Sequence, residues 1–498
     1  MTKSYVLASD LGSGSCKTVI LDATGRVVSS AGAEYPTAYP HPGWVEQNPD
    51  DWYAAFAQTT RHVIAEAGIT ADQIALVGLV AVTHNTVLLD NQDRPLRPCI
   101  LTFDQRSSEQ CRQILARWGD QVQQQARNSV APMWTWPQLL WVKENEPEVW
   151  QKVERILFQK DYVRHRLAPG YVTDSIDAAG TLLFDPVAEA WLPDFYSDLG
   201  LPDSALPRIA QPTDVVSAVS RQGAADTGLA PGTPVIAGTT DTVAEVFGSG
   251  LLEPGQGMVK LASVGRLAVV NSTPIDDPRI LNYRHIIADL WYPGSGTKSA
   301  ATVPRWLRDN LWRQPSFAEM DAAAAQISPG SEGLLFHPHL LGEWAPHWDD
   351  RLRANFIGAT MRHTQAHFTR AALEGVAFAL RDAIEGLAEI GLTYREYRLI
   401  GGGSKSQLWS QIVCDVLGEE FLLPVEQDAA FGAALITGVA AGFFDLDPAA
   451  IQPLVKIEKQ LEPNRQRHAL YSDLFQIYRQ ADRQLSNIAH LLAEFERR

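Results

Sequence analysis

Cysteine is scarce in this chain, and its few cysteines are widely separated. The spacing of Cys16, Cys99, Cys111 and Cys414 matches neither a disulfide framework nor a zinc site, and no CxxC pair occurs. We therefore expect free thiols and a cytoplasmic location, where thiols stay reduced.

Excess positive charge and long apolar segments are also lacking. Lysine and arginine number 42 against 58 aspartates and glutamates, which gives a formal net charge of −16. Such a chain offers no concentrated basic face for a nucleic acid or an anionic membrane. No apolar run reaches the ~18–20 residues of a membrane helix. We expect a strand almost at once at the N-terminus, without a basic-then-apolar signal segment. The sequence indicates an enzyme for small molecules, with neither nucleic acid nor membrane as a partner.

The length indicates two domains. A chain of 498 residues exceeds one ordinary hydrophobic core, and two domains of roughly 200–250 residues each are the expected solution. We predict a first domain over residues 1–245 and a second over residues 246–498. Residues 464–495 carry apolar side chains at helical spacing and are predicted to form a helix on the second domain. A homodimer is one assembly that the sequence allows.

The stretch DLGSGSCK, residues 10–17, has the composition of a phosphate-binding loop. It departs from a Walker A loop, because Cys16 stands where the second glycine belongs, and from a dinucleotide fingerprint, because Lys17 replaces the third glycine. Both of those motifs open a helix, whereas TVILD, ATGR and VVSS follow here as strand, turn and strand. We expect a hairpin loop.

This loop is predicted to bind phosphate through its backbone amides and polar side chains. The candidates are the amides from Gly12 onward, the hydroxyls of Ser13 and Ser15, and the Lys17 ammonium. An ordinary hairpin turn, with glycine for tightness, is the alternative.

The same plan of strand, small-residue loop and continuation occurs again later. An apolar strand ends at Asp241 within residues 233–250, and residues 257–272 form a second hairpin candidate. Residues 397–418 read as a strand, three glycines and an amphipathic helix. Two similar halves closing over one nucleotide would explain this recurrence.

Nine segments in order resemble the FGGY family of carbohydrate kinases, most closely its xylulokinase-like branch. They are DLGSGSCK, HPGWVEQNPDDWY (41–53), residues 80–106, LLWVKENEPEVW (139–150), KDYVRHRL (160–167), TDSIDAAGTLLFD (173–185), GTTDTVAEVFGSG (238–250), residues 339–380, and IGGGSKSQLWSQI with FGAALITG. The resemblance implies an α/β fold of two ribonuclease-H-like, actin-like ATPase domains with an ATP cleft between them.

The resemblance also implies the chemistry of two aspartates. Asp241 would be the catalytic base that receives the proton of the sugar hydroxyl, with capping of the next helix as its alternative role. Asp10, at the corresponding end of the first strand, would hold Mg²⁺ beside the phosphates, or else organise the hairpin. The solvated edge of a strand is the alternative place for Lys17.

On the nucleotide side, Gly401, Gly402 and Gly403 would let the backbone approach adenosine closely, because they carry no Cβ. Ser404 would cap the following helix and offer a hydroxyl. Ser263 is the remaining hydroxyl of a second phosphate hairpin that reads LASVGR in place of the family's glycine–threonine pattern.

On the sugar side, His84 aligns with the histidine that xylulokinases direct at sugar hydroxyls, and Thr83 stands where they usually carry methionine. Asp104 and Trp44 fall in segments that border the sugar pocket in relatives, although a core position is the alternative for both His84 and Trp44. Trp134 and Trp136 also fall near that pocket, and two indoles there are expected to shorten or reshape it.

The resemblance predicts a kinase that phosphorylates the terminal hydroxyl of a ketopentose, D-xylulose in first place, with ATP and Mg²⁺. A kinase for L-xylulose, D-ribulose, erythritol or autoinducer-2 is the alternative within the class. A non-catalytic sugar- or nucleotide-binding regulator is the alternative outside it. The altered loop at Ala262 and Ser263 favours such a regulator, whereas the presence of both Asp10 and Asp241 disfavours it.

Overall fold

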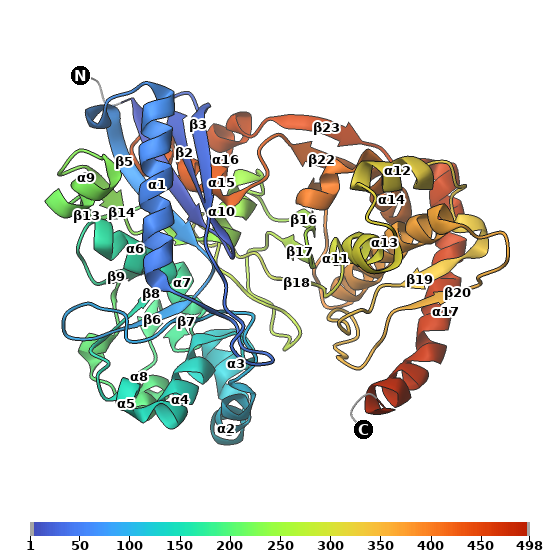
Figure 1. Ribbon diagram of the computed structural model, residues 1–498, viewed down its shortest axis with the longest axis horizontal. Coiled ribbons are helices and arrows are strands. Elements are labelled where there is room, and N and C mark those ends of the chain that lie inside the picture. The colour runs from blue at the N-terminus through green and yellow to red at the C-terminus, as the bar shows by residue number, and fades with distance from the viewer. Residues whose placement is uncertain (1–3, 496–498) are drawn as a thin grey trace.

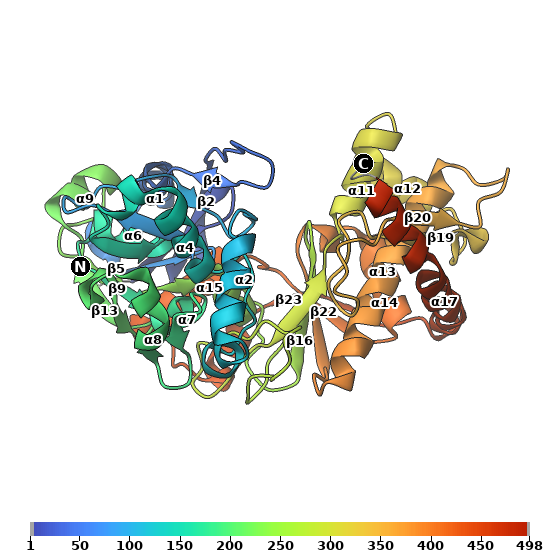
Figure 2. The same cartoon turned by 90° about the horizontal axis from the view of Figure 1, so that it is seen from below.

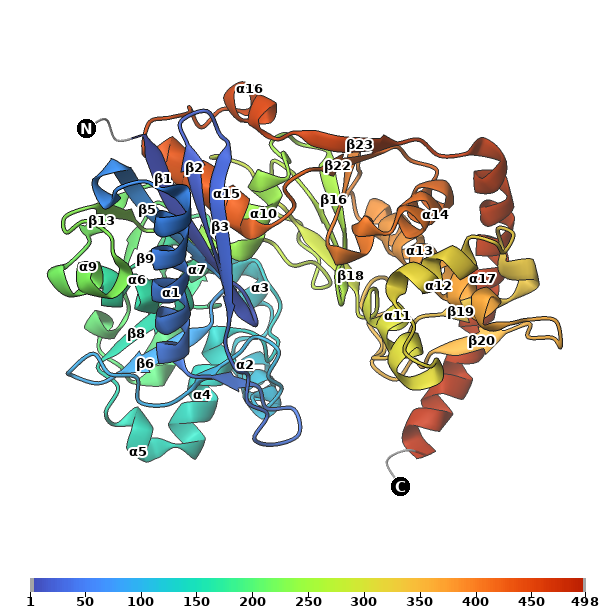
Figure 3. The ribbon, with the colours of Figure 1, turned by 45° about the horizontal axis from the view of Figure 1, so that its top comes forward.

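The computed structural model describes residues 4–495, which form two lobes, each built on one β-sheet (Figure 1). The strands of the second sheet face the first lobe, and most helices of the second lobe lie on its outer side, as Figures 2 and 3 also show. Within these residues, no helix combines the length and apolar character that crossing a bilayer requires. All four cysteines are free, as predicted, and all four are buried.

The first sheet has seven strands: β1 (Tyr5–Leu11), β2 (Ser15–Asp22), β3 (Val27–Glu34), β5 (Ile74–Ala81), β13 (Val215–Ala218), β14 (Pro234–Ile236) and β15 (Thr239–Thr240). Their order is β13-β14-β5-β1-β2-β3, with β15 also beside β5. β1 and β2 pair antiparallel, with Asp10 opposite Lys17. This confirms the predicted hairpin and excludes the two motifs that open a helix.

The second sheet has six strands: β16 (Gln256–Leu261), β17 (Gly265–Val269), β18 (Gly294–Thr297), β21 (Glu396–Ile400), β22 (Phe421–Pro424) and β23 (Ile457–Leu461). Their order is β18-β17-β16-β21-β22-β23. The first three form an antiparallel meander, and β21 and β22 follow in parallel. The first sheet has the same order and directions. The recurring plan in the sequence therefore corresponds to two sheets of one topology.

Two helices link the lobes. α10 (Asp241–Gly248) follows β15, and α15 (Ala429–Ala440), from the second half of the chain, packs against it and against the first sheet. The contact is close because Gly432 has no side chain: a Cβ there would lie 1.8 Å from the carbonyl oxygen of Ala244. Since α15 returns to the first sheet, the domain boundary at residue 245 stays a prediction.

The first sheet is buried on both faces. Along β1, Val6 and Ala8 belong to the core that includes α15, whereas Leu7 and Leu11 belong to the core beneath α1 (Pro49–Ala67). Successive side chains of a strand point to opposite faces, so β1 contributes to two separate cores. This burial fixes the strand register and, with it, the position of Asp10.

The remaining longer elements surround these sheets. The predicted C-terminal helix is confirmed as α17 (Arg465–Phe495), which buries Tyr471, Phe475 and Tyr478 against the second lobe. The other elements that matter below are α4 (Thr135–Asn145), α6 (Gln159–Leu167), α7 (Ser175–Ala179), β19 (Leu335–His337), β20 (Asn355–Ile357), α13 (Gln365–Glu389) and α14 (Gln407–Leu417).

Candidate active site between the lobes

A cavity of about 540 Å³ is lined by residues of both lobes. The first lobe contributes Asp10, Asp241 and Glu245, and the second contributes Lys260 together with the loop that contains Gly402. Both predicted aspartates therefore face the same space, opposite the predicted nucleotide loop.

The strand register explains why the two aspartates meet. β5 lies between β1 and β15, and its Val80 pairs with both Asp10 and Thr239. Asp241 follows β15 directly. Two strand spacings of about 4.8 Å each separate the two backbones, so both carboxylates project from one sheet edge.

The charge state of both carboxylates is strongly perturbed. Asp10 Oδ1 and Asp241 Oδ1 are buried and have no hydrogen-bond partner in the described part of the chain. Burial raises the pKa of Asp10 well above its usual range, and the negative charges of Asp241, Asp428 and Glu245 add to this rise. Lys260 acts in the opposite direction and lowers this pKa, but the rise prevails, so Asp10 lies in a site where negative charges outweigh the positive one.

Burial also raises the pKa of Asp241, to about 6. Lys260 and Arg266 lower this pKa, and Glu245 raises it. Lys260 and Glu245 form an ion pair of 2.6 Å, so two opposite charges act on Asp241 from the same place. Asp241 is thus a carboxylate that is ionised near neutral pH and more basic than an exposed aspartate.

Asp241 does not cap α10. The N-cap is Thr240, whose hydroxyl accepts a hydrogen bond from the Val243 amide, and Asp241 is the first residue of the helix. The alternative role of Asp241 as a cap is therefore wrong.

The three glycines of the loop before α14 have different roles. Gly401, at φ 91°, and Gly402 line the cavity, and a Cβ on Gly402 would meet open space. Gly403 does not line it: its Cβ would lie 2.6 Å from the Trp409 ring and 2.7 Å from Leu261 Cβ. Gly403 is therefore required for packing rather than for an open approach to a ligand.

Ser404 lines the cavity, but the prediction that it caps α14 is wrong. Its hydroxyl donates to the Gly401 carbonyl oxygen (2.7 Å) and contacts Gln427 Oε1 (2.9 Å). The cap is Ser406, which accepts from the Trp409 amide. A short 3₁₀ turn over Gly402–Lys405 delays the start of the helix by two residues.

The first hairpin loop is held by its carbonyl groups. Gln47 donates to the Ser13 carbonyl (2.7 Å), and the Gly12 amide donates to the Ser15 carbonyl (3.0 Å). Ser13 and Ser15 are exposed. Lys17 forms an ion pair with Asp428, the N-cap of α15, whose side chain lines the cavity. The loop therefore lies at the cavity edge, and Lys17 connects it to the second half of the chain.

The second hairpin is confirmed between β16 and β17. Ser263 is exposed at its turn and does not line the cavity. Its carbonyl accepts hydrogen bonds from the Ala300 amide (3.1 Å) and the Thr302 hydroxyl (2.6 Å). The second turn is thus anchored by its backbone, with the Ser263 side chain at the surface.

His84 lies in a fully buried site beside Thr83. Neither ring nitrogen has a hydrogen-bond partner within residues 4–495, and burial lowers the His84 pKa to about 3, so the imidazole is neutral. Its backbone adopts a φ of 49°, and its amide donates to Asp177 (2.6 Å). Asp177 on α7 also binds the buried ammonium of Lys160 (2.8 Å). The backbone of His84 is thus fixed, while its ring is unpaired.

An aromatic row connects His84 to the neighbourhood of Asp241. The His84 ring lies 4.9 Å from Trp134, which lies 6.3 Å from Tyr283, which stacks on Tyr292 at 5.4 Å. The Tyr292 hydroxyl is 2.9 Å from the Thr242 hydroxyl, next to Asp241.

Arg266 of β17 lies over this row. Its guanidinium is 5.4 Å and 5.9 Å from the Tyr283 and Tyr292 ring centres. Within residues 4–495, we find no ion pair or hydrogen bond of its side chain. Arg266, Tyr283 and Tyr292 were not predicted from the sequence, because no motif marks them.

Trp44 and Asp104 both contact the side chain of Arg106. The guanidinium lies 3.7 Å from the Trp44 ring centre and binds Asp104 through two nitrogens, at 2.9 and 2.7 Å. Asp104 also accepts from the Val45 amide (2.6 Å). Asp104 and Trp44 thus contact protein groups here, and their contact with a sugar stays a prediction.

Comparison with family models covers most of the chain. A model described as "FGGY family of carbohydrate kinases, N-terminal domain" matches residues 5–248, and the model for the C-terminal domain matches residues 267–441.

The relatives that match over their full length are also named as carbohydrate kinases. A xylulose kinase of Lactococcus lactis subsp. lactis is 32% identical over 502 residues, covering 99% of both chains. A gluconokinase of Bacillus subtilis is 26% identical over 512 residues, covering 99% of this chain and 98% of the relative. The crystal structure of a xylulose kinase from Rhodospirillum rubrum matches with a TM-score of 0.88 at 26% identity, covering 98% and 100% of the two chains.

Proposed function

The chain belongs to the FGGY family of carbohydrate kinases, with their two-domain actin-like fold, and from this premise we propose that it transfers the γ-phosphoryl group of ATP to the terminal hydroxyl of D-xylulose. The products are xylulose 5-phosphate and ADP. The observation that carries the proposal is the cavity that Asp10 and Asp241 share with the Gly401–Gly402 loop of the other lobe.

Asp241 acts as the base. Its carboxylate accepts the proton of the terminal hydroxyl while that oxygen bonds to the γ-phosphorus, and the bond from phosphorus to the bridging oxygen of ADP breaks. The pKa of about 6 supports this role, because the group is ionised at neutral pH and still basic enough to take the proton. The free Oδ1 is available for the hydroxyl.

The nucleotide binds on the side of the second lobe. Gly402 leaves room for the adenosine, and the Ser404 hydroxyl lies at the same wall. The amides and hydroxyls of the loops at Gly12–Ser15 and at Ser263 are proposed to approach the phosphates when the lobes close. Lys260 adds positive charge inside the cavity.

Asp10 fits the expected Mg²⁺. Its unpaired, buried oxygen lies among carboxylates that raise its pKa, and a hard divalent cation with oxygen ligands would relieve that repulsion. When bound with ATP, the ion supplies neutralisation of the phosphate charge.

His84 is the proposed sugar ligand, next to Thr83. A neutral imidazole with two unpaired nitrogens can donate one hydrogen bond and accept another from a vicinal pair of hydroxyls. Because the ring is fully buried, sugar entry requires movement of the surrounding aromatic side chains, of which Trp134 is the nearest.

Gluconate is the second candidate acceptor. Arg266, which lies over Tyr283 and Tyr292 and lowers the pKa of Asp241, has a guanidinium that suits a carboxylate. The gluconokinase relative of Bacillus subtilis agrees with this alternative.

The test is a coupled assay of ADP release with D-xylulose, L-xylulose, D-ribulose, erythritol, glycerol and gluconate at equal concentration. We expect D-xylulose to give the highest kcat/KM, with a phosphate ester as the product. Preference for gluconate that is lost in Arg266→Met would favour the second candidate. ADP release that no acceptor stimulates would contradict both.

Three assignments remain proposals that rest mainly on the sequence: a domain boundary near residue 245, a cytoplasmic location and a homodimer. Limited proteolysis tests the first, cell fractionation the second and light scattering the third. The free, buried cysteines agree with a reducing compartment.

A further inference from the structure

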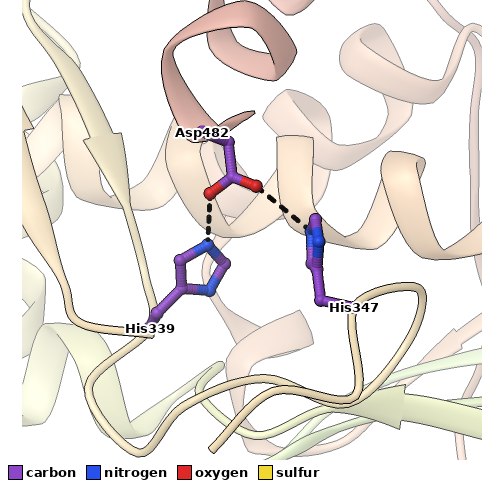
Figure 4. A group of neighbouring side chains, drawn as sticks. All are labelled: His339, His347 and Asp482. Atoms are coloured by element: carbon purple, nitrogen blue, oxygen red, sulfur yellow. Dashed lines mark hydrogen bonds and ion pairs between the residues drawn. The ribbon is translucent and has the colours of Figure 1, made fainter. Parts of the chain in front are cut away.

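Two histidines and two aspartates meet in the second lobe, and Figure 4 shows three of them, His339, His347 and Asp482. His339 follows β19, and His347 lies in the loop between β19 and β20. Asp382 comes from α13 and Asp482 from α17. Figure 4 shows Asp482 directed at both imidazoles, one from each of its oxygens.

The distances between these donors suit one shared cation. His339 Nε2 is 2.9 Å from Asp482 Oδ1, and His347 Nε2 is 3.4 Å from Asp482 Oδ2 and 3.3 Å from Asp382 Oδ2. Metal bonds of roughly 2.0–2.2 Å place two donors about 2.9 Å apart at a right angle and about 3.4 Å apart at a tetrahedral angle. One donor atom from each of His339, His347 and Asp482 lies within 4.8 Å of the others. A contraction of up to about 1.4 Å would bring them to the spacing of a tetrahedral site.

A second carboxylate orients the more buried histidine. Glu343 Oε2 lies 3.3 Å from His339 Nδ1. The other oxygen of Glu343 accepts from the amides of Lys298 and Trp344, at 2.8 Å each, which fixes the carboxylate. A proton on Nδ1 directed at Glu343 leaves the lone pair of Nε2 facing Asp482. Metal-binding histidines commonly have a carboxylate partner of this kind.

We propose that His339, His347, Asp482 and Asp382 form a binding site for one first-row divalent cation, Zn²⁺ in first place. Two imidazoles and carboxylates suit Zn²⁺, whereas Mg²⁺ prefers oxygen ligands alone. His347 is a quarter exposed (side-chain exposure 26%), which gives the ion a route from solvent. This site is separate from the cavity between the lobes, so it does not depend on the proposed kinase activity.

The bound ion would connect three elements distant in the sequence. It would join the β19–β20 loop to α13 and α17, and so secure the C-terminal helix. Arg479 of α17 already binds the other oxygen of Asp382 (3.2 Å), which keeps the two helices in place for the ion. Its expected role is stability, because binding to the folded chain alone raises the melting temperature.

The test uses the full-length protein after removal of metals with a chelator. We expect calorimetry to find one Zn²⁺ per chain and, at a hundredfold excess over Kd, a rise in Tm of roughly 2–3 °C. Co²⁺ in place of Zn²⁺ should give visible absorption typical of four- or five-coordinate cobalt. His347→Ala should abolish both responses.

His490→Gln is the matched control, because His490 is a similarly exposed histidine of α17 that contacts Asp349 rather than this cluster. It should keep both the Tm rise and the cobalt spectrum. If His347→Ala does not fold, His347→Gln replaces it, with circular dichroism as the check. No stoichiometric binding, or equal responses in the His347 and His490 variants, would overturn the proposal and leave a network held by protons.

Discussion

The ion pair beside Asp241 gives the proposed kinase a pH dependence that can be shifted in either direction. Asp241 must be ionised to accept a proton, and its pKa is raised by burial to about 6. The value of kcat/KM for the sugar should therefore fall as the pH decreases through 6. The ionised fraction is about one half at pH 6 and about one tenth at pH 5, so a roughly fivefold loss is expected between these two values.

Neutralising each partner of the pair should move this pKa in opposite directions. Lys260→Met removes a positive charge that lowers the pKa of Asp241 and leaves Glu245 uncompensated, so the acid limb should move upward. Glu245→Gln removes the negative charge and should move it downward. For charges a few ångströms from a buried group, a shift of about one pH unit is the expected size.

The assay is coupled ADP release at saturating ATP, with each variant normalised to its own plateau above pH 8. If the pKa of Asp241 rises by one unit, Lys260→Met at pH 6 should retain about one tenth of its plateau value of kcat/KM. The wild type should retain about one half of its own plateau value at that pH. Lys405→Met is the matched control, since Lys405 also lines the cavity but is not among the main charges acting on Asp241. The reasoning would be refuted if Lys260→Met and Glu245→Gln moved the acid limb in the same direction. It would also be refuted if Lys405→Met moved the acid limb as far as Lys260→Met does.

Three further predictions concern the folded state and its ligands. The pKa of Asp241 is higher in the folded than in the unfolded chain, so its stabilising contribution is lost as the pH rises from about 4 to 6. Asp241→Asn should therefore raise Tm at pH 7.5 by a few degrees in calorimetry. An unchanged or lower Tm would count against a raised pKa of Asp241 in the folded chain. Gly403→Ala should lower Tm because of its contact with Trp409, whereas Gly402→Ala should keep Tm and weaken ADP binding in titration calorimetry; the reverse order would contradict the assignment of the loop. His84→Ala should raise the KM of the sugar at least tenfold and leave the KM of ATP unchanged, and equal effects on both would move His84 away from the sugar.

Local sequence predicts those features that depend on the strand plan. The hairpin at residues 10–17 follows from two strands and a short loop. The meeting of Asp10 with Asp241 follows because both lie at the ends of strands that flank β5 in one sheet. Such features need only the periodicity of side chains and the resemblance between the two halves.

Features that depend on individual partners could not be predicted. Ser404 and Ser406 are both suitable caps, and only the 3₁₀ turn decides between them. Arg106 is two residues from Asp104, yet the stacking of its guanidinium on Trp44 depends on the fold. Glu245 was a signal that was missed, because a position four residues after Asp241 lies on the same face of a helix.

The most direct test of the central claim is the turnover of Asp241→Asn, measured as sugar-dependent ADP release, with sugar binding followed by calorimetry in the same preparation. If the carboxylate in the cavity between the lobes receives the proton of the acceptor, turnover should fall by about 10²–10⁴-fold while the sugar still binds. Turnover close to that of the wild type, in a variant that binds sugar normally, would contradict the account.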